Sequence, residues 1–249
     1  MSYPVRTTAT RKTALVAGVL YLITFISIPS LALYNGVLHN RLFIIHAGGD
    51  AGVLLGAFLE VVVALAGVGT AITLFPVVKR HNQTAARGFA AARVVEGAMI
   101  LAGVVSLVAV VALRQPVASG AHAASLVHTG RTLVAIHNWT FRYGQGLIPA
   151  VNALCLGSVL YRYRLVPRII PALGLVGAPF LVASVVAMAS GLVSQVSVVS
   201  GIATLPIAAW EFSLGIWLVV KGFTISPSTS TDFAAPVRDR QGQLASALA

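Results

Sequence analysis

The sequence predicts an all-α fold, a polytopic membrane helix bundle with six transmembrane helices, and three observations carry this prediction. Hydrophobic residues make up 57% of the 249 residues and charged residues only 9%, whereas a soluble domain carries roughly 25% charged residues. The apolar residues are gathered into six long runs, each able to cross a bilayer core. Most charged residues lie in the segments before, between and after these runs, where they can face water.

The six expected spans cover about residues 14–33, 52–78, 88–113, 139–160, 169–192 and 198–220. They form one membrane domain over residues 14–223, between a polar segment at 1–13 and a tail at 224–249. The tail is rich in Ser, Thr, Pro, Asp and Arg, which predicts disorder. Residues 114–136 contain scattered apolar positions that predict a short helix lying at the membrane surface.

The first apolar run also has features of a secretory signal peptide. Basic residues precede it, and the small residues around Ser30 and Ala32 resemble a cleavage site. The run is long for the apolar part of a signal peptide, and further spans follow it. We therefore expect it to remain as the first transmembrane helix.

Lysine and arginine residues predict the orientation of the chain. If the N-terminus is cytoplasmic, twelve of them fall inside and only Arg41, Arg114 and Arg131 fall outside. This bias predicts cytoplasmic N- and C-termini and contact with anionic lipid headgroups at the cytoplasmic face. The formal net charge of +11 does not indicate nucleic-acid binding, because no basic stripe with interleaved aromatic residues is present.

The three glutamates all fall within expected spans, as do two of the arginines. Glu60, Glu96 and Glu211 each lie eight to ten residues from a span end, which is roughly 12–15 Å at 1.5 Å per residue. Charges at that depth are costly and almost always face the protein interior. Arg93 and Glu96 are three residues apart and can pair on one helix face. We therefore expect one buried cluster that consists of Glu60, Arg93, Glu96, Arg142 and Glu211.

Small residues continue the helix faces that carry these charges. Gly52 and Gly56 precede Glu60 at intervals of four, and Gly215 follows Glu211 by four. Such stripes let helices approach closely, which predicts that the charged faces are packing faces. The cluster is then either a site for a small solute, an ion or a proton, or a structural network that stabilises the bundle. The sequence favours no cofactor and is compatible with assembly of several copies into a homo-oligomer.

Histidines near the outer rim offer a further alternative, an intramembrane metal-dependent hydrolase. His46 and Asp50 are four residues apart, and with His137 they have the ligand types that bind zinc. No HExxH, GxSxG or phosphate-binding glycine loop accompanies them. Solvent-facing loop histidines are the simpler interpretation, so the sequence leans against an enzyme.

Four stretches resemble the bacterial membrane family called domain of unknown function 4386. They are Arg93-Val94-Val95-Glu96; His137 to Phe141 with Gly144 and Gly146; Tyr161 to Arg168 with Leu173-Gly174; and Pro206 to Glu211 with Leu218 to Gly222. The resemblance extends over about residues 14–223 and implies a six-helix protein of the bacterial plasma membrane with an uncleaved first span. It implies no activity. Arg142 departs from the apolar residue expected there.

Overall fold

The computed structural model describes residues 8–46, 48–193 and 197–224. Every regular element in these residues is helical, and six helices are long and apolar enough to cross a membrane. These spans are Thr10–Ser27, Asp50–His81, Gln83–Ala112, Gly120–Arg162, Ile169–Ala189 and Val198–Val220. The prediction of an all-α, six-span membrane fold is confirmed. The expected disordered tail and most of the N-terminal segment lie outside the described residues.

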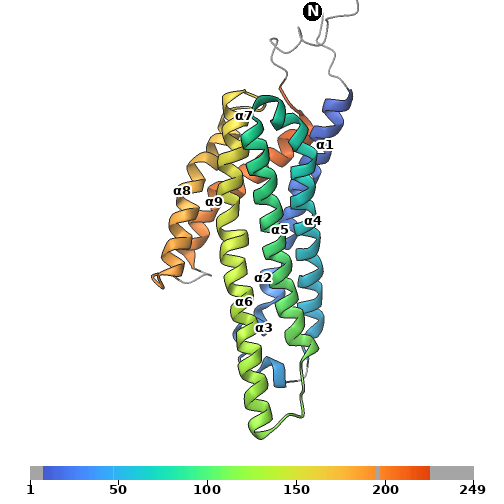
Figure 1. Ribbon diagram of the computed structural model, residues 1–249, viewed down its shortest axis with the longest axis vertical. Helices are drawn as coiled ribbons and strands as arrows, with labels where there is room; N and C mark the ends of the chain where they lie inside the picture. Colours follow the sequence, from blue (N-terminus) through green and yellow to red (C-terminus); the bar gives the residue numbers. More distant parts are fainter. Residues whose placement is uncertain (1–7, 47, 194–196, 225–249) are drawn as a thin grey trace, which may run out of the picture.

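The six spans form a closed ring. They comprise α1 (Thr8–Ile23), α4 (Asp50–His81), α5 (Gln83–Ala112), α6 (Gly120–Asn152), α8 (Ile169–Ala189) and α9 (Val198–Val220). In the order α1, α4, α5, α6, α8, α9, each helix packs against the next, and α9 packs against α1 (Figure 1). The start of α1 and the end of α9 therefore lie at the same end of the bundle.

Helix ends in the ring are set by local hydrogen bonds. Asn82 follows α4 directly, and its side chain accepts a hydrogen bond from the Ala85 backbone N–H, so that α5 begins at once. Ser197 caps α9 in the same way through the Ser200 N–H. Side-chain oxygens at these positions satisfy N–H groups that a helix start leaves without partners. At the other end of α9, Arg11 donates to the carbonyls of Leu218 and Val219 at 2.9 and 2.5 Å.

The first span is not the continuous helix expected for residues 14–33. After α1 the chain forms a short 3-10 turn, η1 (Thr24–Ser27), and after Pro29 it continues as the short helices α2 (Ser30–Leu33) and α3 (Asn35–His39). Thr24 Oγ1 donates to the Tyr21 carbonyl at 2.6 Å, and Ser30 Oγ donates to the Ser27 carbonyl at 2.6 Å. The two side chains donate hydrogen bonds to backbone carbonyls and so compete with the regular helical pattern. Pro29 has no backbone N–H, so it cannot donate a helical hydrogen bond.

The expectation of a separate surface helix within residues 114–136 is wrong. Residues from Gly120 onward form the first half of α6, which continues through a π-helical turn, η3 (Ala153–Gly157), into α7 (Ser158–Arg162). This helical segment has 43 residues, about 65 Å at 1.5 Å per residue, more than twice the thickness of a hydrocarbon core. A helix does not have to end where its surroundings become polar.

An extension of the bundle at its predicted outer end, called the outer extension, explains the apolar residues that suggested a surface helix. Beyond the ends of α8 and α9, the longer helices α4, α5 and α6 continue together (Figure 1). There α6 packs against a second 3-10 turn, η2 (Phe43–Ile45). The side chains of Leu126, Val127, Leu133 and Val134 contact a buried apolar cluster that includes Phe43 and Ile44. These four residues therefore bury apolar surface within the protein.

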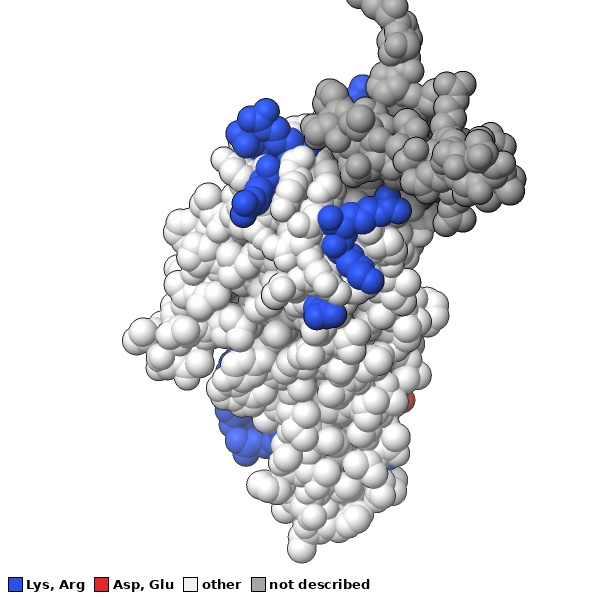
Figure 2. Space-filling view, turned by 45° about the horizontal axis from the view of Figure 1, so that its top comes forward, with Lys and Arg blue, Asp and Glu red and all other residues white. Residues whose placement is uncertain are grey.

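Basic side chains gather at the end of the bundle where α1 begins, as the space-filling view shows, and a broad surface with few charged side chains lies below them (Figure 2). The described basic residues of this end are Arg11, Lys12, Lys79, Arg80, Arg87, Arg162, Arg164, Arg168 and Lys221. Arg41, Arg114 and Arg131 belong to the opposite end. This distribution is the one on which the predicted orientation depends.

Candidate functional site

Three charged side chains from two helices meet inside the ring. Arg93 of α5 donates through Nη1 to Glu96 Oε2 at 3.0 Å and through Nη2 to Glu211 Oε1 of α9 at 2.6 Å. Asn152 of α6 adds a third helix, because its Nδ2 donates to Glu96 Oε2 at 2.7 Å. We call Arg93, Glu96 and Glu211 the charged cluster. The pairing of Arg93 with Glu96, predicted from their spacing, is confirmed.

The cluster is buried, and aromatic rings cover its cation. Arg93 is 2% exposed and Glu96 8%. The Arg93 guanidinium carbon lies 5.2 Å from the centre of the Tyr21 ring and 5.8 Å from that of Phe89. Arginine stays charged in proteins and stacks favourably on aromatic faces. These contacts fix the guanidinium in position without neutralising it.

Glycines bring the neighbouring helices close to the charged cluster. A Cβ added to Gly97 would lie 3.3 Å from Val68 Cγ2 of α4, and one added to Gly144 would lie 2.9 Å from Met99 Cβ of α5. On α4, an added Cβ at Gly56 would lie 2.5 Å from the Tyr34 ring. Gly56 was predicted to lie on a packing face, as was Gly215, whose added Cβ would lie 3.0 Å from Leu22 Cδ2 of α1, and both predictions are confirmed.

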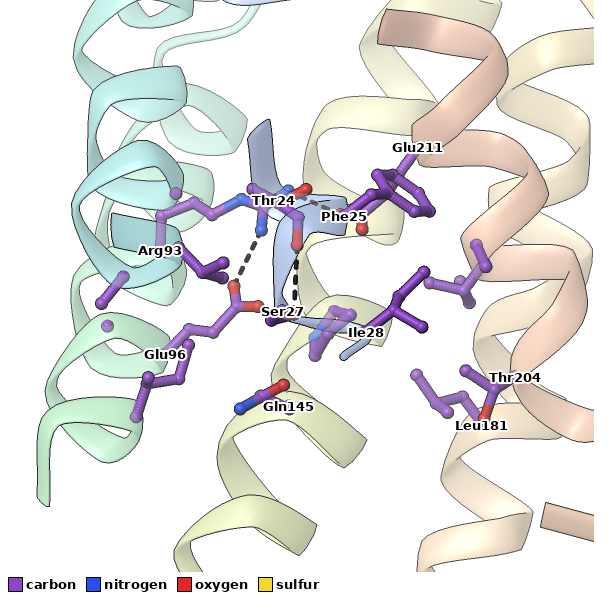
Figure 3. A pocket seen from close by; sticks show the side chains of 18 residues that line it. Thr24, Phe25, Ser27, Ile28, Arg93, Glu96, Gln145, Leu181, Thr204 and Glu211 are labelled. Atoms are coloured by element: carbon purple, nitrogen blue, oxygen red, sulfur yellow. Dashed lines mark hydrogen bonds and ion pairs between the residues drawn. The ribbon is translucent and has the colours of Figure 1, made fainter. Parts of the chain in front are cut away.

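A cavity of about 210 Å³ lies beside the charged cluster. Arg93, Glu96 and Glu211 line one part of it, and η1 contributes Thr24 and Ser27. All six spans contribute lining residues. Figure 3 shows the chain after α1 passing between the helix that carries Arg93 and Glu96 and the helix that carries Glu211. The break in the first span thus forms part of the cavity wall.

Glu60 lies outside the charged cluster but is connected to the same cavity. Its carboxylate is 2% exposed. It accepts hydrogen bonds from the Tyr34 hydroxyl and from Gln145 Nε2, each at 3.2 Å. Gln145 also lines the cavity. The inward orientation predicted for the three glutamates is confirmed, but Glu60 is held by neutral donors rather than by an arginine.

Arg142 does not join the charged cluster, contrary to the five-residue cluster expected from the sequence. Its guanidinium carbon lies 4.7 Å from the centre of the Trp139 ring, one turn away on α6. Trp139 is 43% exposed and stacks on Tyr143. The arginine side chain therefore lies against the Trp139 ring on α6, away from the carboxylates that pair with Arg93. Its position on a face with Gly146 was compatible with either direction.

The residues predicted to lie at the outer rim do not converge into a metal site. Asp50 forms an ion pair with Arg114, and His46 Nδ1 lies 2.9 Å from the Leu42 carbonyl oxygen. His137 is buried with its Nδ1 3.4 Å from the Gly103 carbonyl oxygen. In the described part of the chain, no group of three or more His, Cys, Asp or Glu residues is placed to hold a metal ion. The hydrolase alternative therefore lacks a ligand set.

Three polar residues of the site were not predicted: Tyr34, Gln145 and Asn152. Gln145 and Asn152 were visible as amides inside an apolar run, a position that calls for a hydrogen-bonding partner. Tyr34 directly follows the first expected span, a position typical of interfacial tyrosines, but it is 1% exposed. Each of them is a direct hydrogen-bond donor to a buried glutamate.

The ring of spans and its buried charges define a multi-pass membrane protein with a polar site between its helices. Residues 16–222 match the family model described as Domain of unknown function (DUF4386), and the chain belongs to this family. The resemblance drawn from the sequence motifs is thereby confirmed. No curated protein and no solved structure matches the chain.

Proposed function

We propose that this protein binds a small cation, or a proton, in the cavity beside the charged cluster and carries it across the membrane. The observation that supports the proposal most is the charge of the cavity wall. One guanidinium faces two carboxylates, so the cluster has one surplus negative charge when both are ionised. Of the three, Glu211 is the most exposed side chain, at 14%.

Burial makes the surplus charge significant. An uncompensated charge in a low-dielectric interior is costly, and a bound cation or proton removes that cost. Electrostatic attraction is also stronger there than in water. A proton would neutralise one carboxylate of the charged cluster, whereas a small cation would be coordinated from the cavity. Either outcome would leave Arg93 with one carboxylate as its counter-charge.

The interrupted first span supports a transport role. Broken helices that line a site near the membrane midplane are a recurring feature of secondary transporters. Here η1 contributes Thr24 and Ser27 to the cavity, and Pro29 follows it. Movement of this short segment relative to α5 and α9 would change access to the cluster with little change in the rest of the ring.

We further infer that the chain lies in a bacterial plasma membrane with both ends in the cytoplasm. Nine described basic residues lie at the end where α1 begins, against three at the other. This excess supports the cytoplasmic assignment of that end.

A structural role is the competing candidate, and the pairing of Arg93 with both carboxylates favours it. Arg93 connects α5 to α9, and Asn152 connects Glu96 to α6. Such a network could stabilise the bundle without binding anything. The two candidates differ in whether the charged cluster responds to cations.

The distinguishing experiment compares Glu211→Gln with Asp50→Asn. Each variant removes one negative charge, but Asp50 pairs with Arg114 at the outer end. Purified protein is titrated with sodium, potassium and methylammonium at several pH values while thermal unfolding is followed. The proposal predicts that at least one cation, or protons, stabilises the wild type and Asp50→Asn but not Glu211→Gln. If cations and protons changed the thermal stability of all three proteins equally, the cation-binding proposal would be contradicted and the structural role favoured.

A further inference from the structure

A second cavity, of about 190 Å³, lies in the outer extension between the α3–η2 segment and α6. We propose that it binds the headgroup phosphate of an anionic phospholipid. Its lining combines two guanidiniums, Arg41 and Arg131, with the side-chain amide of Asn138 and an apolar floor that includes Phe43 and Val134. The site is separate from the cavity beside the charged cluster.

The two arginines supply the charge that a phosphate requires. Within the described residues, neither Arg41 nor Arg131 has an ion-pair or hydrogen-bond partner. The third basic residue of this end, Arg114, is already bound to Asp50 and to the Phe43 carbonyl. A guanidinium presents a planar array of donors that matches phosphate oxygens. Two guanidiniums on opposite walls can hold one phosphate between them.

Aromatic residues on α6 and α7 indicate the depth of this cavity. Trp139 and Tyr161 are 43% and 39% exposed. They are 22 residues apart in one helical segment, about 33 Å at 1.5 Å per residue, close to the roughly 30 Å of a hydrocarbon core. Trp and Tyr concentrate at the two edges of that core. We therefore place the outer edge of the core near Trp139.

This depth brings the cavity to the headgroup layer. Asn138 is adjacent to Trp139, and Arg131 lies seven residues further out, about 10 Å along the helix. A headgroup can thus enter between the amide and the guanidiniums while its chains remain beside Trp139. Arg142 lies on the same face of α6, four residues inward from Asn138, and stacks on Trp139. Basic pockets at this depth are a known mode of anionic lipid recognition.

The test uses the fluorescence of Trp139 in nanodiscs. Brominated phosphatidylglycerol or brominated phosphatidylcholine is added, and bromine quenches the fluorescence of nearby tryptophans. The quenching that is lost in Trp139→Phe is the contribution of Trp139 and is assigned to the outer site. We expect the wild type to prefer phosphatidylglycerol by roughly 30-fold, about fivefold for each arginine near the surface. The double variant Arg41→Gln/Arg131→Gln should lower this preference to about twofold or less. Both side chains are exposed, so folding should not suffer.

The control is Arg80→Gln/Arg87→Gln, which removes the same charge at the opposite end, also from exposed positions. It should retain the preference at Trp139. Three results would overturn the proposal: equal quenching by both lipids in the wild type, an equal loss in the control, or complete relief of quenching by inorganic phosphate. The last result would identify a free phosphate as the ligand.

Discussion

Arg93 Nη2 lies 2.6 Å from Glu211 Oε1, although the two residues are 118 positions apart in the chain. This ion pair joins α5 to α9 across the ring of spans, while Nη1 of the same guanidinium donates to Glu96. Arg93 is therefore one cation shared between carboxylates of two helices. Several consequences can be measured.

Removal of the shared cation should destabilise the protein strongly. Arg93→Leu leaves two carboxylates buried without a counter-charge, a change that typically costs about 3–5 kcal/mol. The free energy of unfolding in mixed micelles measures it. Arg142→Leu is the control, because it removes an arginine of the same bundle that does not contact the cluster glutamates in the described hydrogen bonds. A cost for Arg93→Leu no larger than for the control would show that the cluster contributes little to stability.

The Tyr34 hydroxyl should matter for stability, although the residue resembles an interfacial tyrosine in the sequence. Tyr34→Phe removes a donor to Glu60 and leaves a buried acceptor less satisfied, which costs about 1–3 kcal/mol. Tyr143→Phe deletes the same atom from a tyrosine that is 39% exposed and should change stability by about 0.5 kcal/mol or less. Equal effects of the two variants would contradict the buried Tyr34–Glu60 bond.

Arg11 should act as a cap for the C-terminal end of α9. Its guanidinium donates to the carbonyls of Leu218, Val219 and Val220, where a cation also complements the helix dipole. Arg11→Gln should cost about 1–2 kcal/mol and should speed amide exchange in the last turn of α9. Lys12→Gln removes the same charge from an exposed neighbour. Faster exchange at α9 in the Lys12 variant alone would refute the cap.

Gly174 should be intolerant of a side chain because α8 and α9 touch there. An added Cβ would lie 2.5 Å from Trp210 Cδ2, whereas one added to Gly201 of α9 meets nothing within 4 Å. Gly174→Ala should therefore lower the free energy of unfolding by about 1–3 kcal/mol, and Gly201→Ala should be neutral or slightly stabilising. Thermal unfolding of the two variants checks the difference. A stable Gly174→Ala protein would contradict the close packing of Trp210 on α8.

The sequence predicted the spans, the inward glutamates and the Arg93–Glu96 pair, because each depends on depth or on spacing within one helix. The direct contact between Arg93 and Glu211 could not be predicted, since it depends on which helices face each other across the ring. The break after α1 could have been predicted from the sequence, because Thr24, Ser27 and Pro29 are residue types that interrupt regular helical hydrogen bonding. The prediction that Arg142 joins the cluster was wrong because the side chain of an arginine on a small-residue face can also lie along an aromatic ring of its own helix.

The central claim is that Glu211 supplies a surplus charge to which a cation or proton binds. Infrared difference spectroscopy of the carboxyl bands tests it most directly, by exchange of the buffer between cation-free and cation-containing solutions and between two pH values. The account predicts a carboxylate signal in the wild type and in Asp50→Asn that is absent from Glu211→Gln. A signal that persists unchanged in Glu211→Gln, or no signal in the wild type, would contradict it.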